Sequence, residues 1–245
     1  MNGNARQIKL FCFPYAGGSA AIFSRWKTLL HPSVNMRAVE LAGRGERIGD
    51  TLYQDVPDMI GDLLQRIEAE ISALPYALFG HSLGSTICYE LYKKIREKGL
   101  PLPVHLFFSG AGALHVIRAD EKKYHLMSDA EFKKEVLELG GTPPEFFEHP
   151  ELLQIFLPML KNDFRMAEQE LVGELIPIEG DITVFLGKED DLTPEQCDGW
   201  KLYTRQVCRM YYFEGGHFFL QRLGAAVVSV INQTLLEYTP YRQLQ

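Results

Sequence analysis

The stretch Gly80-His81-Ser82-Leu83-Gly84 decides the fold, because it places G-x-S-x-G between a predicted strand and a predicted helix. The apolar run Tyr76–Phe79 precedes it, directly after Pro75, and is typical of a short buried strand. Residues at helical spacing follow it as far as Gly99: Thr86, Ile87, Leu91 and Ile95. This context predicts a nucleophile elbow, in which the flanking glycines avoid collisions and the serine hydroxyl stands at the strand tip.

Length and composition limit the class of protein. The chain has 245 residues, of which 46% are apolar and 23% charged, which suits one large α/β domain or two small ones. Its net charge is −7 and its basic residues are dispersed, so we expect no nucleic-acid partner. Neither a signal peptide before Ile8 nor an apolar run of the roughly 20 residues needed to span a membrane is expected.

The cysteines and histidines favour neither a disulfide framework nor a metal site. The four cysteines are scattered without a C-x-x-C pair, as in reduced proteins, and we expect buried free thiols and a cytoplasmic location: Cys12, Cys88, Cys197 and Cys208. The seven histidines show no H-x-x-x-H spacing. We therefore expect neither a metal nor a bound cofactor.

Strands and helices alternate along most of the chain. The predicted strands are Ile8–Phe13, Met36–Leu41, Tyr76–Phe79, Val104–Phe108, Asp181–Leu186 and Arg209–Phe213. Helical patterns separate them, beginning with Phe23, Trp26 and Leu30, continuing with Val56–Ala73 and ending with the pattern through Val227 and Leu235. We predict one α/β domain over 1–245, with a mostly parallel sheet, helices on both faces and ligands at the carboxyl ends of the strands.

One segment, about 114–175, has helical patterning and no convincing strand. Ser128-Asp129-Ala130-Glu131 predicts a capping box for a helix that ends at Gly140-Gly141. Pro143-Pro144 begins a second unit, whose predicted apolar face contains Leu152, Leu153, Phe156, Leu157 and Leu160. We interpret the segment as a helical lid that excludes water from the site. Two ordinary packing helices are the alternative.

A serine nucleophile requires a base and an acid that orients the base. Among the histidines after Ser82, only His217 lies in a glycine-rich turn directly after a late strand. The acid is expected after the strand that ends at Leu186. We prefer Asp190 there, with Asp191 second and Glu189 third.

The oxyanion of a tetrahedral intermediate requires two N–H donors. One donor is expected from the backbone of Leu83, directly after the nucleophile. The other is expected from Ala16, because small residues in the loop Pro14–Gly18 let the main chain approach a substrate carbonyl. A loop that serves only as a turn is the alternative.

These residues together resemble a known family. The chain is similar over nearly its whole length to the type II thioesterases, stand-alone α/β-hydrolases that accompany non-ribosomal peptide and polyketide synthases. The resemblance rests on Phe11–Gly18, Gly43–Arg47, Gly80–Gly84, Leu157-Pro158 with Asp163 and Arg165, and Gly215–His217. The F-x-F-P-x-A-G-G opening is far more specific than G-x-S-x-G. Ala42 departs from the family, which usually has proline there, and we expect only a loop change from it.

The resemblance implies a substrate and a partner. The substrate would be an acyl thioester on the phosphopantetheine arm of an acyl- or peptidyl-carrier protein, and the role would be to clear stalled synthases in antibiotic biosynthesis. The family implies a monomer. Lys122-Lys123 and Lys133-Lys134 are candidates for a carrier-docking patch. The alternatives are a medium-chain fatty-acyl thioesterase, a small-ester carboxylesterase and a non-catalytic hydrolase-fold binding protein.

Overall fold

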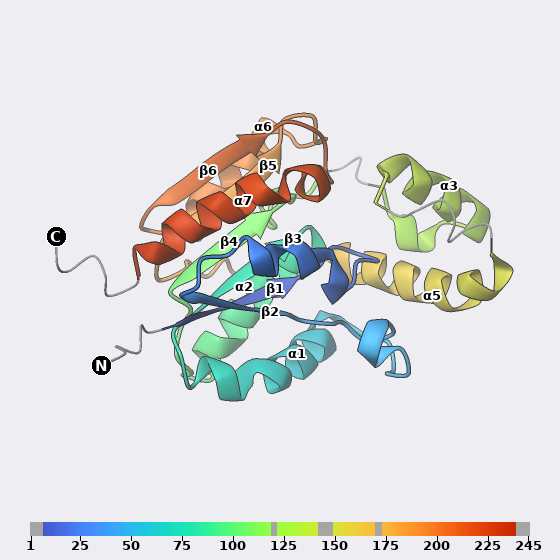
Figure 1. Ribbon diagram of the computed structural model, residues 1–245. Helices are drawn as coiled ribbons and strands as arrows, with labels where there is room; N and C mark the ends of the chain where they lie inside the picture. Colours follow the sequence, from blue (N-terminus) through green and yellow to red (C-terminus); the bar gives the residue numbers. More distant parts are fainter. Residues whose placement is uncertain (1–6, 119–121, 142–148, 170–172, 239–245) are drawn as a thin grey trace.

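A parallel β-sheet forms the centre of the computed structural model, which describes residues 7–118, 122–141, 149–169 and 173–238 (Figure 1). Its six strands have the order β2-β1-β3-β4-β5-β6, and every pairing between them is parallel. Their bounds are Ile8–Phe13 (β1), Val34–Ala38 (β2), Tyr76–His81 (β3), His105–Ser109 (β4), Ile182–Gly187 (β5) and Cys208–Phe213 (β6). The predicted α/β fold with a mostly parallel sheet is confirmed.

Two hydrophobic layers cover the two faces of the sheet. Alternate residues of β1 face opposite sides: Phe11 packs in one layer and Cys12 in the other. The helices α1 (Val56–Ile71) and α2 (Leu83–Glu97) build the first layer, whereas α7 (Phe219–Leu236) and the 3₁₀ helix η1 (Ala20–Thr28) build the second. Three shorter helices follow β2 and β5 along the chain: η2 (Gly45–Arg47) after β2, and α6 (Pro194–Asp198) and η4 (Gly199–Tyr203) after β5.

The second strand differs from its predicted range. It runs from Val34 to Ala38, in register with β1, and the prediction of Met36–Leu41 was wrong at both ends. The chain leaves the sheet after Ala38, but Val39 and Leu41 remain buried in the hydrophobic layer. Their apolar character therefore reflects packing and not strand pairing.

Helix α7 is long and apolar enough to span a membrane by length and composition. In this fold it is a core helix, because Val227, Val228 and Ile231 are buried against the sheet. Its apolar residues are therefore accounted for by packing within the domain.

The chain between β4 and β5 forms helices that lie together at one end of the molecule (Figure 1). These are η3 (Tyr124–Leu126), α3 (Asp129–Leu139) and α5 (Pro150–Ala167). The capping box at Ser128 is present, and Gly140 ends α3 with φ 78°. Leu157 and Leu160 of α5 pack against α3, but Leu152, predicted on the apolar face, is 45% exposed. Pro143-Pro144 lies outside the described residues.

The turn between β3 and α2 is strained at one residue. Ser82 has φ 55° and ψ −115°, and among the described residues it is the only non-glycine with positive φ. A Cβ on Gly80 would overlap the carbonyl group of Gly84, and a Cβ on Gly84 would overlap that of Phe13. Both glycines are thus required for α2 to begin so close to β1 and β3.

We predict that Gly80→Ala destabilises the protein by about 1–3 kcal/mol or more, because the added methyl group meets backbone that cannot move away. Gly61→Ala is the matched control. Gly61 lies in α1 with open space around its Cα, so the same change should stabilise the protein by about 0.5–1 kcal/mol. Urea denaturation of both variants measures the two effects, and equal effects would contradict this account of the elbow.

Candidate active site

The five residues predicted for the site line one cavity of about 590 Å³: Ala16, Ser82, Leu83, Asp190 and His217. They come from the segments that directly follow β1, β3, β5 and β6, at the carboxyl ends of these strands. This is the edge at which parallel sheets bind ligands. The structure therefore brings together residues up to about 200 positions apart in the sequence.

Ser82 lies at the start of α2. Its N–H donates to the Ser109 carbonyl at the end of β4 at 2.7 Å, which fixes the turn against the neighbouring strand. Leu83 is the first helical residue, so its N–H has no carbonyl within the helix to bind. A helix N-terminus favours negative charge. The N–H of Leu83 is thus available to an oxyanion formed beside Ser82.

His217 and Asp190 are paired. His217 Nδ1 lies 3.1 Å from Asp190 Oδ2, and the Asp190 side chain is 9% exposed. Two backbone bonds hold their loops together: the N–H of Lys188 donates to Phe213 at 2.8 Å, and that of Glu189 donates to Gly215 at 3.0 Å. Because Asp190 occupies Nδ1, Nε2 is the nitrogen that can accept a proton from a serine.

The two other carboxylates on this turn are exposed to solvent. Asp191 has a side chain that is 93% exposed, and its Oδ2 is 3.0 Å from Arg118 Nη1. Glu189 is also exposed. Of the three residues considered as the acid, Asp190 is the one that the structure places against His217.

His81 is a residue that the sequence analysis missed. It is fully buried, and burial lowers its pKa well below the usual value, so the ring is neutral. Nε2 lies 3.0 Å from the carbonyl oxygen of His217, to which it donates, and Nδ1 accepts from the Ser109 hydroxyl at 2.8 Å. His81 therefore ties the loop that carries His217 to β3 and β4. It occupies a variable position of the G-x-S-x-G pattern, so spacing alone gave no signal.

The remaining wall of the cavity has apolar and basic parts. Leu114, Val116 and Phe164 provide surface suited to an acyl chain. Lys122 and Lys123 also line the cavity, where Lys122 pairs with Glu135 on α3. Lys133 and Lys134 do not line the cavity.

The parallel sheet, the strained serine elbow and the His217–Asp190 pair define a hydrolase of the α/β-hydrolase fold. Comparison with known proteins gives the family. The chain belongs to the thioesterase domain family, whose model matches residues 8–235.

Individual relatives match this chain over most of their length. The crystal structure of ClbQ from the colibactin NRPS/PKS pathway has a TM-score of 0.88 and 35% identity, and the match covers 94% of this chain and 98% of ClbQ. Linear gramicidin dehydrogenase LgrE of Brevibacillus parabrevis is 35% identical, and the match covers 95% of this chain and 89% of LgrE. The medium-chain S-acyl fatty acid synthase thioesterase of Rattus norvegicus is 32% identical, and the match covers 88% of this chain and 82% of the rat protein.

We predict that Asp190→Asn lowers kcat by about 10³–10⁴-fold, because the amide cannot hold His217 in the required tautomer. Asp191→Asn is the matched control, one residue away on the same turn. It should change kcat by less than about threefold, because exposed ion pairs contribute little. Steady-state hydrolysis of an acyl thioester measures both variants, and a larger loss in Asp191→Asn would assign the acid to that residue.

Proposed function

We propose that this thioesterase hydrolyses acyl thioesters carried on the phosphopantetheine arm of acyl- or peptidyl-carrier proteins, and so regenerates stalled or mis-primed synthases. The observation that carries the proposal is the single cavity that holds Ser82 together with the His217–Asp190 pair. Such a cavity can hold a thioester against a nucleophile, a base and N–H donors at the same time.

The proposed mechanism has two steps. Ser82 Oγ attacks the thioester carbonyl while His217 accepts its proton, and the N–H groups of Leu83 and Ala16 bind the oxyanion. The C–S bond then breaks, and the thiol leaves with the proton. In the second step a water molecule, activated by His217, attacks the acyl-serine and releases the carboxylic acid. Asp190 keeps His217 oriented and stabilises its charged form.

The relatives support the carrier-bound substrate. ClbQ comes from an NRPS/PKS pathway, in which acyl groups are attached to carrier proteins. The dehydrogenase activity in the name of LgrE is not proposed for this chain. A dinucleotide-binding fold usually has G-x-G-x-x-G after its first strand, whereas this chain has Pro14–Gly18 and then Ser19.

A medium-chain fatty-acyl thioesterase is the second candidate function. It is favoured by the rat fatty acid synthase thioesterase at 32% identity and by the apolar wall of the cavity. Both candidates use the same catalytic residues, so they differ in the leaving group and the acyl chain that they accept.

Other parts of the proposal rest on the sequence. We propose a monomer in the cytoplasm that needs no cofactor and binds neither nucleic acid nor membrane. Lys122 and Lys123 are the better candidates for the docking patch, because they line the cavity and Lys133 and Lys134 do not.

Hydrolysis of one acyl group from three leaving groups tests the proposal. The acetyl group is presented on a carrier protein, on coenzyme A and on a simple aryl ester, to wild type and to Ser82→Ala. We expect kcat/KM to be highest for the carrier-bound thioester and to fall by at least about 10³-fold in Ser82→Ala.

Each other outcome has a definite meaning. Equal or higher activity on the aryl ester would assign a general esterase. A further assay with a medium-chain acyl group on the same carrier protein separates the two candidate functions: a preference for this group over acetyl would favour the fatty-acyl function. Equal activity of wild type and Ser82→Ala would overturn the role of the serine.

A further inference from the structure

We propose that Asp163 of α5 is a positioning residue that holds the oxyanion loop, defined as Tyr15–Gly18, in its active conformation. The inference rests on the proposed function, because it takes the N–H of Ala16 in this loop as an oxyanion donor. It assigns a catalytic contribution to a helix that contributes none of the five predicted site residues.

The oxyanion loop forms a tight turn, whose type depends on the orientation of its central peptide group. The N–H of Gly18 donates to the Tyr15 carbonyl at 2.8 Å, and Gly17 has φ +79°, as at the third position of a type II turn. Ala16 is the second residue of this turn. Turns of this kind change type by rotation of the central peptide, here the one that joins Ala16 to Gly17. This peptide carries the N–H of Gly17, so a hydrogen-bond acceptor for that N–H fixes the type of turn that the loop adopts around Ala16.

Asp163 holds that group. The N–H of Gly17 donates to Asp163 Oδ2 at 2.7 Å, across 146 positions of sequence. A hydrogen bond to a carboxylate is stronger than one to a neutral acceptor. Leu160 of α5 also packs over Gly17, where an added Cβ would overlap it. Helix α5 thus fixes both the orientation of the peptide and the space around it.

Arg44 fixes Asp163 in turn. Its Nη1 and Nη2 each lie 2.6 Å from one carboxylate oxygen of Asp163, and Nη1 also donates to the carbonyl of Gly18 at 3.0 Å. The two side chains are only 6% and 2% exposed. A buried pair of this kind resists separation, because each charge left alone would be costly. The pair therefore holds the oxyanion loop from two sides.

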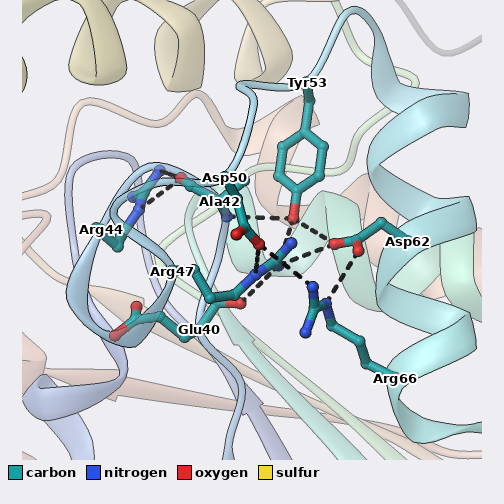
Figure 2. Close-up of polar contacts among 8 residues, drawn as sticks. All are labelled: Glu40, Ala42, Arg44, Arg47, Asp50, Tyr53, Asp62 and Arg66. Atoms are coloured by element: carbon teal, nitrogen blue, oxygen red, sulfur yellow. Dashed lines mark hydrogen bonds and ion pairs between the residues drawn. The ribbon is translucent and has the colours of Figure 1, made fainter.

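The loop that carries Arg44 is fixed by a second polar network (Figure 2). Arg47 Nη1 donates to the Tyr53 hydroxyl and to Asp62 Oδ2, both at 2.9 Å, and the hydroxyl donates to Asp62 at 2.7 Å. The N–H of Ala42 donates to the same hydroxyl at 3.3 Å, which the proline common in the family could not do. The departure at Ala42 thus adds a contact to this network.

Two further contacts hold the C-terminal end of α5 to this region. Arg165 Nη2 donates to the Tyr53 carbonyl at 2.8 Å, and Gln169, just after the helix, accepts from the N–H of Val56 at 2.9 Å. The predicted lid is therefore anchored at this end to the start of α1 and to the loop before it. The anchor makes Asp163 a fixed support for the loop.

Two double variants distinguish the effect of the Asp163–Gly17 hydrogen bond on activity from the effect of the buried Arg44–Asp163 ion pair. Both carry Arg44→Met. One carries Asp163→Asn, which keeps an acceptor for the N–H of Gly17, and the other carries Asp163→Leu, which removes it. Neither variant has a buried unpaired charge, so thermal unfolding should differ by only a few degrees between them. The kinetics are measured with acyl-coenzyme A or an aryl ester.

We expect kcat of the double variant with Asp163→Leu to be about 10- to 100-fold below that of the double variant with Asp163→Asn, with KM values within about threefold. The loss should be smaller than the 10²–10³-fold typical for removal of a whole oxyanion donor. Binding of a boronic acid, which forms a tetrahedral adduct with a nucleophilic serine, should weaken in parallel with kcat. Equal kcat values and equal boronic-acid affinities in the two variants would overturn the proposal.

A third variant of this protein is used if the double variant with Asp163→Leu does not fold. Glycolate in place of Gly17, introduced during in vitro translation, replaces the N–H by an ester oxygen and keeps both side chains of the ion pair. A tenfold or larger loss of kcat supports the proposal, and unchanged kcat overturns it. Ser82→Ala in the same assay identifies the other failure: retained activity there would refute the proposed serine mechanism and not the role of Asp163.

Discussion

The close approach of α2 to β1 and β3 is the constraint on which the rest of the site depends. It is possible only because Gly80 and Gly84 lack side chains, and it forces Ser82 into its strained backbone conformation. The strain is held by packing on both sides, since both neighbouring strands are buried. In return, the serine hydroxyl and the first N–H groups of a helix meet at one end of a rigid sheet.

The other site residues are fixed to this elbow by buried polar contacts. His81, within the motif itself, donates to the backbone of His217, and the loops after β5 and β6 bind each other through backbone N–H groups. On the opposite side, the Arg44–Asp163 pair holds the loop that carries Ala16. A site of this kind keeps its donors in place before the reaction begins, which is the condition for strong electrostatic stabilisation.

The fold was predictable because its sequence signals are local. The contacts that support the site join residues far apart in the sequence, so they were not predictable in this way. The elbow glycines, the apolar strands and the capping box at Ser128 each act over a few residues, so sequence alone identified them. The end of β2 was misplaced because burial and pairing produce the same apolar pattern. The partners of Asp163 lie more than 100 positions away, so its role could not be read from spacing.

Trapping the acyl-enzyme tests most directly whether Ser82 is the nucleophile. The protein is mixed with excess acyl-pantetheine, quenched in acid within milliseconds, digested and analysed by mass spectrometry. If Ser82 is the nucleophile, the mass of the acyl group is added to the peptide that contains Ser82, and Ser82→Ala acquires no such adduct. An adduct on another residue, or full turnover by Ser82→Ala, would contradict the mechanism.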